Sequence, residues 1–135
     1  MGIALTGAVT IDDPDVVAEI AVQLARYEAA LMDNDIAVLD MLFWKSGLTR
    51  RFGANENLYG FDAIAAYRIA RPGGAAPRRV LRRSITSFGR DFATADIEFQ
   101  PVGSERTGRQ TQSWVRAPEG WRIVSAHVSF LAPSV

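Results

Sequence analysis

The hydrophobic period of this chain changes once, at Pro72-Gly73-Gly74, and no other feature constrains the fold as strongly. Before that point apolar residues recur every three to four positions, as they do in amphipathic helices. Beyond it, runs of β-branched and aromatic residues alternate with turns that contain Gly or Pro. Helices that precede a set of hairpin-connected strands predict an α+β fold.

The helical half begins at Asp13-Pro14, which supplies a capping carboxylate and a proline for the first helical position. Asp33-Asn34-Asp35 ends this helix and caps a second, shorter one. Two short strands joined by a Gly-Ala-Asn turn then lead to a third helix. We therefore expect helices over 14–32, 36–43 and 61–71, with strands over 48–52 and 57–60.

The extended half contains four segments, over 78–89, 92–101, 107–117 and 120–132, and each junction between them carries Gly or Pro. Such junctions predict hairpins, so the four strands should form an antiparallel meander. Three helices packed on a strongly curved, mainly antiparallel sheet would enclose a cone, whose mouth is a pocket for a small ligand. The expected organisation is an N-terminal arm over 1–12 and a single domain over 13–132.

Composition narrows the possible functions. The 135 residues include no cysteine and one histidine, and no Gly-rich phosphate loop is present, so we expect neither a metal site nor a bound cofactor. The net charge is zero and no apolar run approaches the ~18 residues of a membrane helix, which argues against nucleic-acid and membrane partners. Because the chain lacks cysteine and a basic signal-peptide start, its predicted location is the cytoplasm.

Arg50 and Arg51 are adjacent on a predicted short strand, where neighbouring side chains point to opposite faces. Alternation groups Arg50 with apolar neighbours, which favours Arg50 as the inward residue. An arginine that holds an anion needs hydrogen-bonding neighbours and room, and Thr49 and Gly53 offer these to Arg51. Whichever guanidinium is buried needs a carboxylate, from the protein or from a ligand. The candidate partners within the chain are Glu56 and Asp62.

Tyr27 and His127 are further candidates for chemistry. Tyr27 lies on the apolar stripe of the first helix, so its hydroxyl needs a buried partner. A nearby cation would lower its pKa from an unperturbed ~10 and make it a usable acid. His127 shares a predicted strand face with Trp121 and Ile123, where it either makes a structural hydrogen bond or lines the pocket.

Six stretches carry a family resemblance: RYEAAL (26–31), LFW (42–44), ENLYGFDAI (56–64), FGRDFATADIEF (88–99), GRQTQSWVR (108–116) and EGWRIVSAHVS (119–129). Together they resemble the AtzH-like family, which includes HpxZ-type proteins of oxalurate catabolism. That family belongs to the nuclear-transport-factor-2-like superfamily, with the SnoaL-like and ketosteroid-isomerase-like proteins. The resemblance implies the superfamily's cone-shaped, cystatin-like α+β barrel.

The resemblance also implies an activity. The better-known branch of the family is similar to a small cofactor-free amidohydrolase that removes a carboxylate from an N-carboxylated urea. Its proposed catalytic residues, a tyrosine on the first helix and an arginine before an aromatic-glycine pair, match Tyr27 and Arg51. We therefore expect Arg51 to bind a substrate carboxylate and Tyr27 to act as general acid, because a carbamate-type nitrogen loses CO2 when it is protonated. The other residues expected to hold the substrate are Asn57, Arg68, Arg71 and His127.

Other roles stay open at this point. The HpxZ-type members suggest an accessory protein beside an amidase, or a non-catalytic binder of a small acid. A ketosteroid-isomerase-like activity is disfavoured, because no carboxylate is well placed as a base deep in the pocket. We also expect a homodimer or tetramer through an exposed sheet face. The residues predicted for that interface are Gln110, Gln112, Trp114 and Arg116.

Overall fold

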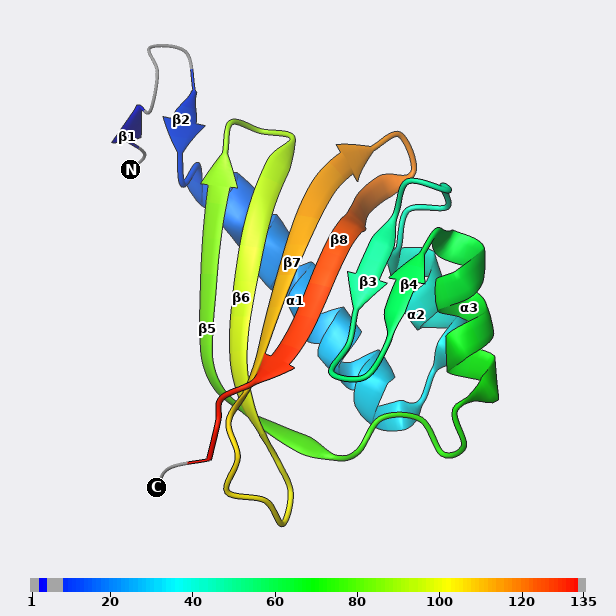
Figure 1. Ribbon diagram of the computed structural model, residues 1–135. Coiled ribbons are helices and arrows are strands. Elements are labelled where there is room, and N and C mark those ends of the chain that lie inside the picture. Colours follow the sequence, from blue (N-terminus) through cyan, green and yellow to red (C-terminus); the bar gives the residue numbers. More distant parts are fainter. Residues whose placement is uncertain (1–2, 5–8, 134–135) are drawn as a thin grey trace.

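Helix α1 (Pro14–Asp33) crosses one face of a curved sheet, and α2 (Ile36–Leu42) and α3 (Phe61–Ala70) lie toward one end of that sheet (Figure 1). The computed structural model describes residues 3–4 and 9–133. The predicted α+β fold, with helices on a curved and mostly antiparallel sheet, is confirmed. The strands in the described part of the chain are β1 (Ile3–Ala4), β2 (Thr10–Ile11), β3 (Arg50–Phe52), β4 (Asn57–Tyr59), β5 (Arg78–Phe88), β6 (Phe92–Pro101), β7 (Gly108–Ala117) and β8 (Gly120–Phe130).

These strands form one sheet in the order β1-β2-β5-β6-β7-β8-β3-β4. Strands β5 to β8 are the predicted antiparallel meander. Strand β3 adds to β8 in parallel and pairs with β4 antiparallel, which extends the sheet toward α3. The predicted N-terminal arm over 1–12 lies partly outside the described residues, and its described part supplies β1 and β2 at the β5 edge.

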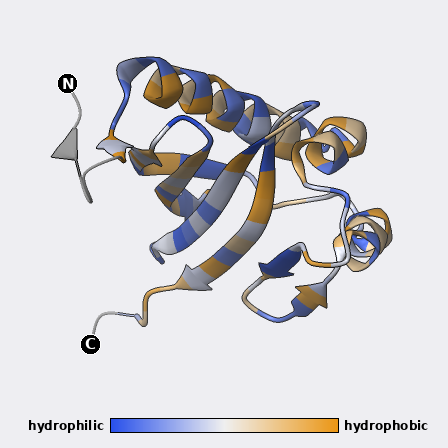
Figure 2. Ribbon diagram, turned by 90° about the horizontal axis from the view of Figure 1, so that it is seen from above, coloured by the Kyte–Doolittle hydropathy of each residue, from blue (hydrophilic) through white to orange (hydrophobic). Residues whose placement is uncertain are grey.

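Helix α1 forms because capping residues stand at both of its ends and its apolar residues recur at helical spacing between them. The Asp13 carboxylate accepts a hydrogen bond from the backbone N–H of Asp15 at 3.0 Å, and Asn34 ends the helix in the left-handed conformation. Apolar and polar residues alternate around α1 and along the long strands (Figure 2). None of the described helices combines the length and hydrophobicity needed to cross a bilayer. The side chains of α1 buried against the sheet include Val16, Ile20, Leu24, Tyr27 and Leu31.

A β-bulge in β8 changes which side chains face the helices. The pairing with β7 shifts register, which leaves Val124 as an extra residue in β8. Ile123 before the bulge and Ala126 after it are therefore both buried. His127 consequently lies on the outer face of the sheet, where it is exposed. The predicted shared face of His127 and Ile123 is wrong, because strict alternation does not allow for the bulge.

The inward face of β7 carries two glutamines that we expected at an exposed interface. Gln110, Gln112 and Trp114 are each at most 2% exposed, because this side of β7 is covered by α1. Gln112 Oε1 accepts a hydrogen bond from Trp114 Nε1 at 3.1 Å, so the strand buries an amide together with an indole. The predicted interface is wrong for Gln110, Gln112 and Trp114, whereas the Arg116 side chain is 33% exposed and its place in an interface stays a prediction. A homodimer or tetramer through another part of the sheet stays a prediction.

Candidate functional site

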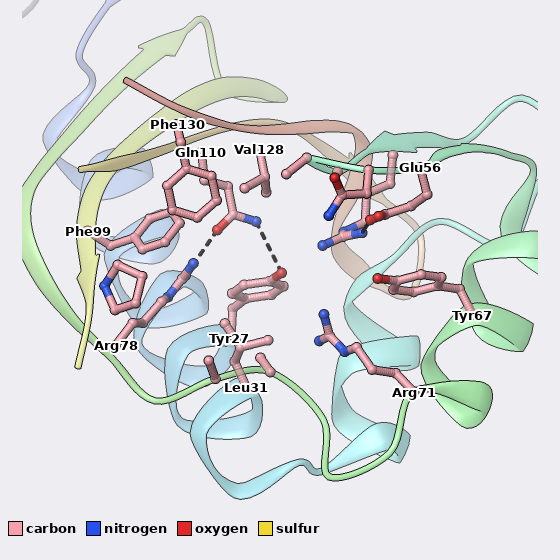
Figure 3. A pocket seen from close by; sticks show the side chains of 17 residues that line it. Tyr27, Leu31, Glu56, Tyr67, Arg71, Arg78, Phe99, Gln110, Val128 and Phe130 are labelled. Carbon is pink, nitrogen blue, oxygen red and sulfur yellow. Dashed lines mark hydrogen bonds and ion pairs between the residues drawn. The ribbon is translucent and has the colours of Figure 1, made fainter. Parts of the chain in front are cut away.

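A cavity of about 190 Å³ opens beside α1 and α3, between the loop that joins β3 to β4 and the inward side of β5 to β8 (Figure 3). Apolar side chains such as Leu31, Phe99 and Phe130 form one part of its wall. The hydroxyls of Tyr27 and Tyr67 point into the space (Figure 3). The charged and amide side chains that line it include Arg51, Glu56, Arg71, Arg78 and Gln110.

Strand β3 directs Arg51, and not Arg50, into this cavity. Arg51 is paired with the buried Ala126 of β8, so its side chain faces inward and is 12% exposed. Arg50 is exposed, and its Nη1 donates to the carbonyl of Leu48 at 3.3 Å. Alternation from apolar neighbours favoured the wrong residue, because Leu48 is itself 70% exposed.

Glu56 is the carboxylate that accompanies Arg51 within the chain. Arg51 Nη1 donates to Glu56 Oε2 at 3.1 Å, while Asp62, the other expected partner, is exposed on α3. A Cβ on Gly53 would collide with the Glu56 carboxylate, so glycine at this position permits the close approach. Glu56 therefore holds one edge of the Arg51 guanidinium at the rim of the cavity.

Arg71 is the cation of the cavity that has no carboxylate partner among the described residues. Its guanidinium lies over the Tyr67 ring, 5.5 Å from the centroid, and points toward the space that Tyr27 faces (Figure 3). Arg71 Nε is buried and makes no hydrogen bond in the described part of the protein. A guanidinium N–H can only donate, so this group lacks an acceptor.

Arg68 lies deeper, beside a recess of about 10 Å³ that adjoins Tyr27, Arg51 and Arg71. This volume is about the minimum that holds one water molecule. Arg68 Nη1 donates to Asp40 Oδ1 at 2.7 Å. Burial lowers the pKa of Arg68 below its ordinary value, against the opposing effects of Tyr27 and Asp40.

Tyr27 is 2% exposed, and its hydroxyl oxygen accepts a hydrogen bond from Gln110 Nε2 at 3.1 Å. Burial raises the pKa of this hydroxyl, whereas the positive charges of Arg51, Arg78 and Arg68 lower it, as does the bond from Gln110. The lowering effects are larger together, so the pKa of Tyr27 lies below its ordinary value of 10.0. Sequence reasoning expected a cation beside this phenol.

The lowered pKa of Tyr27 predicts a pH dependence of stability. The native protein releases this proton at lower pH than the unfolded chain, whose tyrosine titrates near 10.0. The free energy of unfolding should therefore rise as pH increases through the native pKa toward 10, and this gain is lost as pH falls back through the native pKa. Tyr27→Phe should lack the rise. Denaturant unfolding of both proteins at a series of pH values checks this, and parallel profiles would contradict it.

Three arginines around the cavity form ion pairs with carboxylates, and a fourth arginine forms none with the described residues. The carboxylates Glu56, Asp40 and Glu28 pair with Arg51, Arg68 and Arg78, respectively. Arg71 is the remaining charge, so the described groups around the cavity carry a net charge of about +1. Among the described residues, no group of three or more His, Asp and Glu is arranged to hold a metal ion.

The structure brings together only some of the residues expected to hold a substrate. Arg71 lines the cavity and Arg68 lines the recess beside it. Asn57 on β4 and His127 on β8 are exposed, and neither is among the residues that line the cavity. Asn57 follows the tight turn after β3 and its position alternates outward, opposite Phe52. These two residues have no geometric support as ligand contacts.

Sequence reasoning missed Arg78, Gln110 and Tyr67, which all line the cavity. Gln110 lies 83 positions from Tyr27, and no local pattern links the two. Tyr67 lies one residue before Arg68 on α3, and only its position on the helix could have indicated it.

Comparison with known proteins identifies related chains. A family model described as AtzH-like matches residues 9–134. The crystal structure of a protein of unknown function from the DUF3225 family of Pectobacterium atrosepticum SCRI1043 is 49% identical, with a TM-score of 0.87 over 90% of this chain and 95% of that chain. A cystatin-like fold protein from Burkholderia xenovorans LB400 is 39% identical, with a TM-score of 0.88 over 94% of this chain and 100% of that chain.

A more distant structure shares the fold alone. An NTF2-like protein of unknown function from Pseudomonas putida KT2440 is 20% identical, with a TM-score of 0.74 over 91% of this chain and 90% of that chain. The predicted cystatin-like, NTF2-like fold is thereby confirmed. A comparison with curated proteins gave no match.

Proposed function

This chain belongs to the AtzH-like family, and we propose that it is a small cofactor-free amidohydrolase of the decarboxylating type, acting on a carboxylated urea or amide. Arg51 and Arg71 bind the substrate carboxylate, and Tyr27 is the general acid. The observation that carries this proposal is the unpartnered guanidinium of Arg71 beside the buried Tyr27 hydroxyl. N-carboxylated ureas are the substrate class that we would examine first. Oxalurate carries its carboxylate on carbon, so it serves as a binding probe and not as a substrate of this step.

The charges of the cavity support a small monoanion as its ligand. Arg71 is half-buried, and its buried Nε lacks an acceptor, so a ligand that brings a carboxylate would satisfy this group. A single negative charge would neutralise the net charge of about +1 around the cavity. The volume of about 190 Å³ lies below the ~300–1,000 Å³ of pockets for drug-sized ligands, which favours a molecule of few heavy atoms.

The proposed step breaks the bond between the substrate nitrogen and its carboxylate carbon. The electron pair of that bond goes to nitrogen, which receives the Tyr27 proton, and CO2 leaves. Tyr27 is left as a phenolate and recovers a proton from solvent. The neighbouring arginines and the Gln110 hydrogen bond stabilise the phenolate, as their lowering of the Tyr27 pKa indicates.

Ligand-linked stabilisation tests the anion-binding part of this proposal. At a hundred times Kd, oxalurate or an N-carboxylated urea should stabilise the wild-type protein by ~2.7 kcal/mol, which a thermal-shift assay detects as a raised Tm. Arg71→Met should lose most of that shift. The matched control is Arg79→Met, since Arg79 is exposed on β5 and bonds to Gln100 outside the cavity. Equal shifts in both variants would contradict the role of Arg71.

The alternative is a non-catalytic binder of small acids that partners an amidase in oxalurate or ureide catabolism. The Arg51–Glu56 ion pair favours this alternative. A ligand carboxylate would compete with Glu56 for the Arg51 guanidinium, as expected for reversible binding. Carboxylate-dependent stabilisation without turnover, together with retention by an amidase from the native host, would support this role over the enzyme.

A further inference from the structure

Four side chains form a hydrogen-bonded chain: Glu28, Arg78, Gln110 and Tyr27. Figure 3 shows its part along the cavity wall, from Arg78 through Gln110 to Tyr27. Arg78 Nε and Nη2 donate to the two oxygens of Glu28 at 2.9 and 2.8 Å, and Nη2 also donates to Gln110 Oε1 at 3.0 Å. Gln110 Nε2 then donates to the Tyr27 hydroxyl at 3.1 Å. The Arg78 guanidinium also lies over the Phe99 ring, 4.3 Å from its centroid, so its position is fixed from three sides.

Arg78 determines which way the Gln110 amide points. A guanidinium has no acceptor, so only the amide oxygen of Gln110 can face Arg78. The amide nitrogen must then face Tyr27, and this nitrogen can only donate. The orientation of the amide is therefore set by the hydrogen-bond network.

The same logic sets the direction of the Tyr27 hydrogen. Its oxygen already accepts from Gln110, so its own O–H must point elsewhere. The cations whose charges act on it, Arg51, Arg78 and Arg68, are donors and cannot accept it. Among the described residues no hydrogen bond is donated by the Tyr27 hydroxyl. The cavity is the remaining direction.

We propose that Gln110, oriented by Arg78, is a positioning residue that directs the Tyr27 hydroxyl proton into the cavity toward the bound ligand. This inference rests on the proposed function, in which Tyr27 is the acid. After the transfer, the same amide N–H stays on the phenolate oxygen. The charged groups that surround the phenol are Arg51, Arg68, Arg71 and Arg78, with the carboxylates Glu28, Asp40 and Glu56.

A titration that needs no substrate tests the contact. The tyrosinate absorbance of the wild type minus that of Tyr27→Phe gives the Tyr27 step. Gln110→Met keeps a similar volume and removes the donor, so the step should move to higher pH. Gln112→Met is the matched control, because Gln112 is the next inward residue of β7 and bonds to Trp114 instead. A Tyr27 step that is unmoved in Gln110→Met, or that moves equally in Gln112→Met, would overturn the inference.

Turnover tests the positioning. In Gln110→Glu a carboxylate accepts both from Arg78 and from the Tyr27 O–H, which turns the proton away from the cavity. We expect kcat for an N-carboxylated urea to fall at least ~10²-fold with KM within a few-fold. If Tyr27→Phe is inactive while Gln110→Glu has the kcat of the wild type, the positioning role is wrong and the proposed function stands. If Tyr27→Phe is fully active, the proposed function is wrong, and the titration still decides the contact.

The Gln110→Glu variant buries a carboxylate, so its folding is checked by thermal unfolding. If it does not fold, Gln110→Met takes its place in the turnover assay. A kcat of Gln110→Met equal to that of the wild type would then overturn the positioning role.

Discussion

Tyr27→Phe should lower kcat for an N-carboxylated urea about 10²–10⁴-fold and change KM little, as expected when a general acid is removed. The substitution keeps the ring, which packs near Phe43 with the centroids 6.4 Å apart, and removes the only proton that the buried phenol can donate. Arg51 and Arg71 remain in place to bind the carboxylate, so the loss falls on the chemical step. Steady-state rates of CO2 release measure it.

The control for this prediction is Tyr67→Phe. Tyr67 presents a second phenol to the cavity from α3, and its ring lies under Arg71 and Arg51 at 5.5 and 5.9 Å. Phenylalanine keeps that stacking, so kcat should stay within a few-fold of the wild type. A larger loss from Tyr67→Phe than from Tyr27→Phe would assign the acid to Tyr67. Tyr27→Phe also leaves Gln110 Nε2 without its acceptor, at a cost of about 1–3 kcal/mol, so rates must be compared well below Tm.

The fold could be predicted because its signals are local. The Asp13-Pro14 cap, the left-handed stop at Asn34 and the Gly or Pro turns between the long strands each act within a few residues. The helices and the strands β3 to β8 begin and end within two residues of the predicted bounds, whereas no strand was predicted where β1 and β2 lie. The bulge at Val124 was missed because one inserted residue leaves the apolar pattern of β8 ambiguous. Strict alternation therefore predicted His127 on the inner face of the sheet, whereas it lies on the outer face.

The site was only partly predictable, because its bonds join distant parts of the chain. Tyr27 and Arg51 could be found from the family resemblance and from the need of a buried phenol for a partner. Arg78 contacts Glu28 across 50 positions, and Gln110 contacts Tyr27 across 83. In the sequence, Arg78 is one arginine of a basic run and Gln110 is a polar residue on an alternating strand. Only the packing of α1 across β7 makes Gln110 a buried part of the site.

Asp40→Ala should lower the free energy of unfolding by roughly 3 kcal/mol. Asp40 accepts from Arg68 at 2.7 Å, and the Arg68 side chain is only 9% exposed, so the substitution leaves a buried guanidinium without its carboxylate. We expect the lower end of the range for broken buried pairs, because Asp40 is 23% exposed and water can enter in its place. Denaturant unfolding at neutral pH measures the loss.

The matched variant Arg68→Met should be much less destabilising, although it breaks the same ion pair. Methionine fills the buried volume over the Phe43 ring, where the Arg68 guanidinium lies 4.7 Å from the centroid. The carboxylate left behind, Asp40, is on the more exposed side and can be solvated. Equal losses from Arg68→Met and Asp40→Ala would contradict this asymmetry.

Arg68→Met also removes one of the charges that lower the pKa of Tyr27, so the Tyr27 titration should move to higher pH. The Arg68 guanidinium therefore affects two properties of the protein. Its burial costs free energy unless Asp40 pairs with it, and its positive charge lowers the pKa of Tyr27.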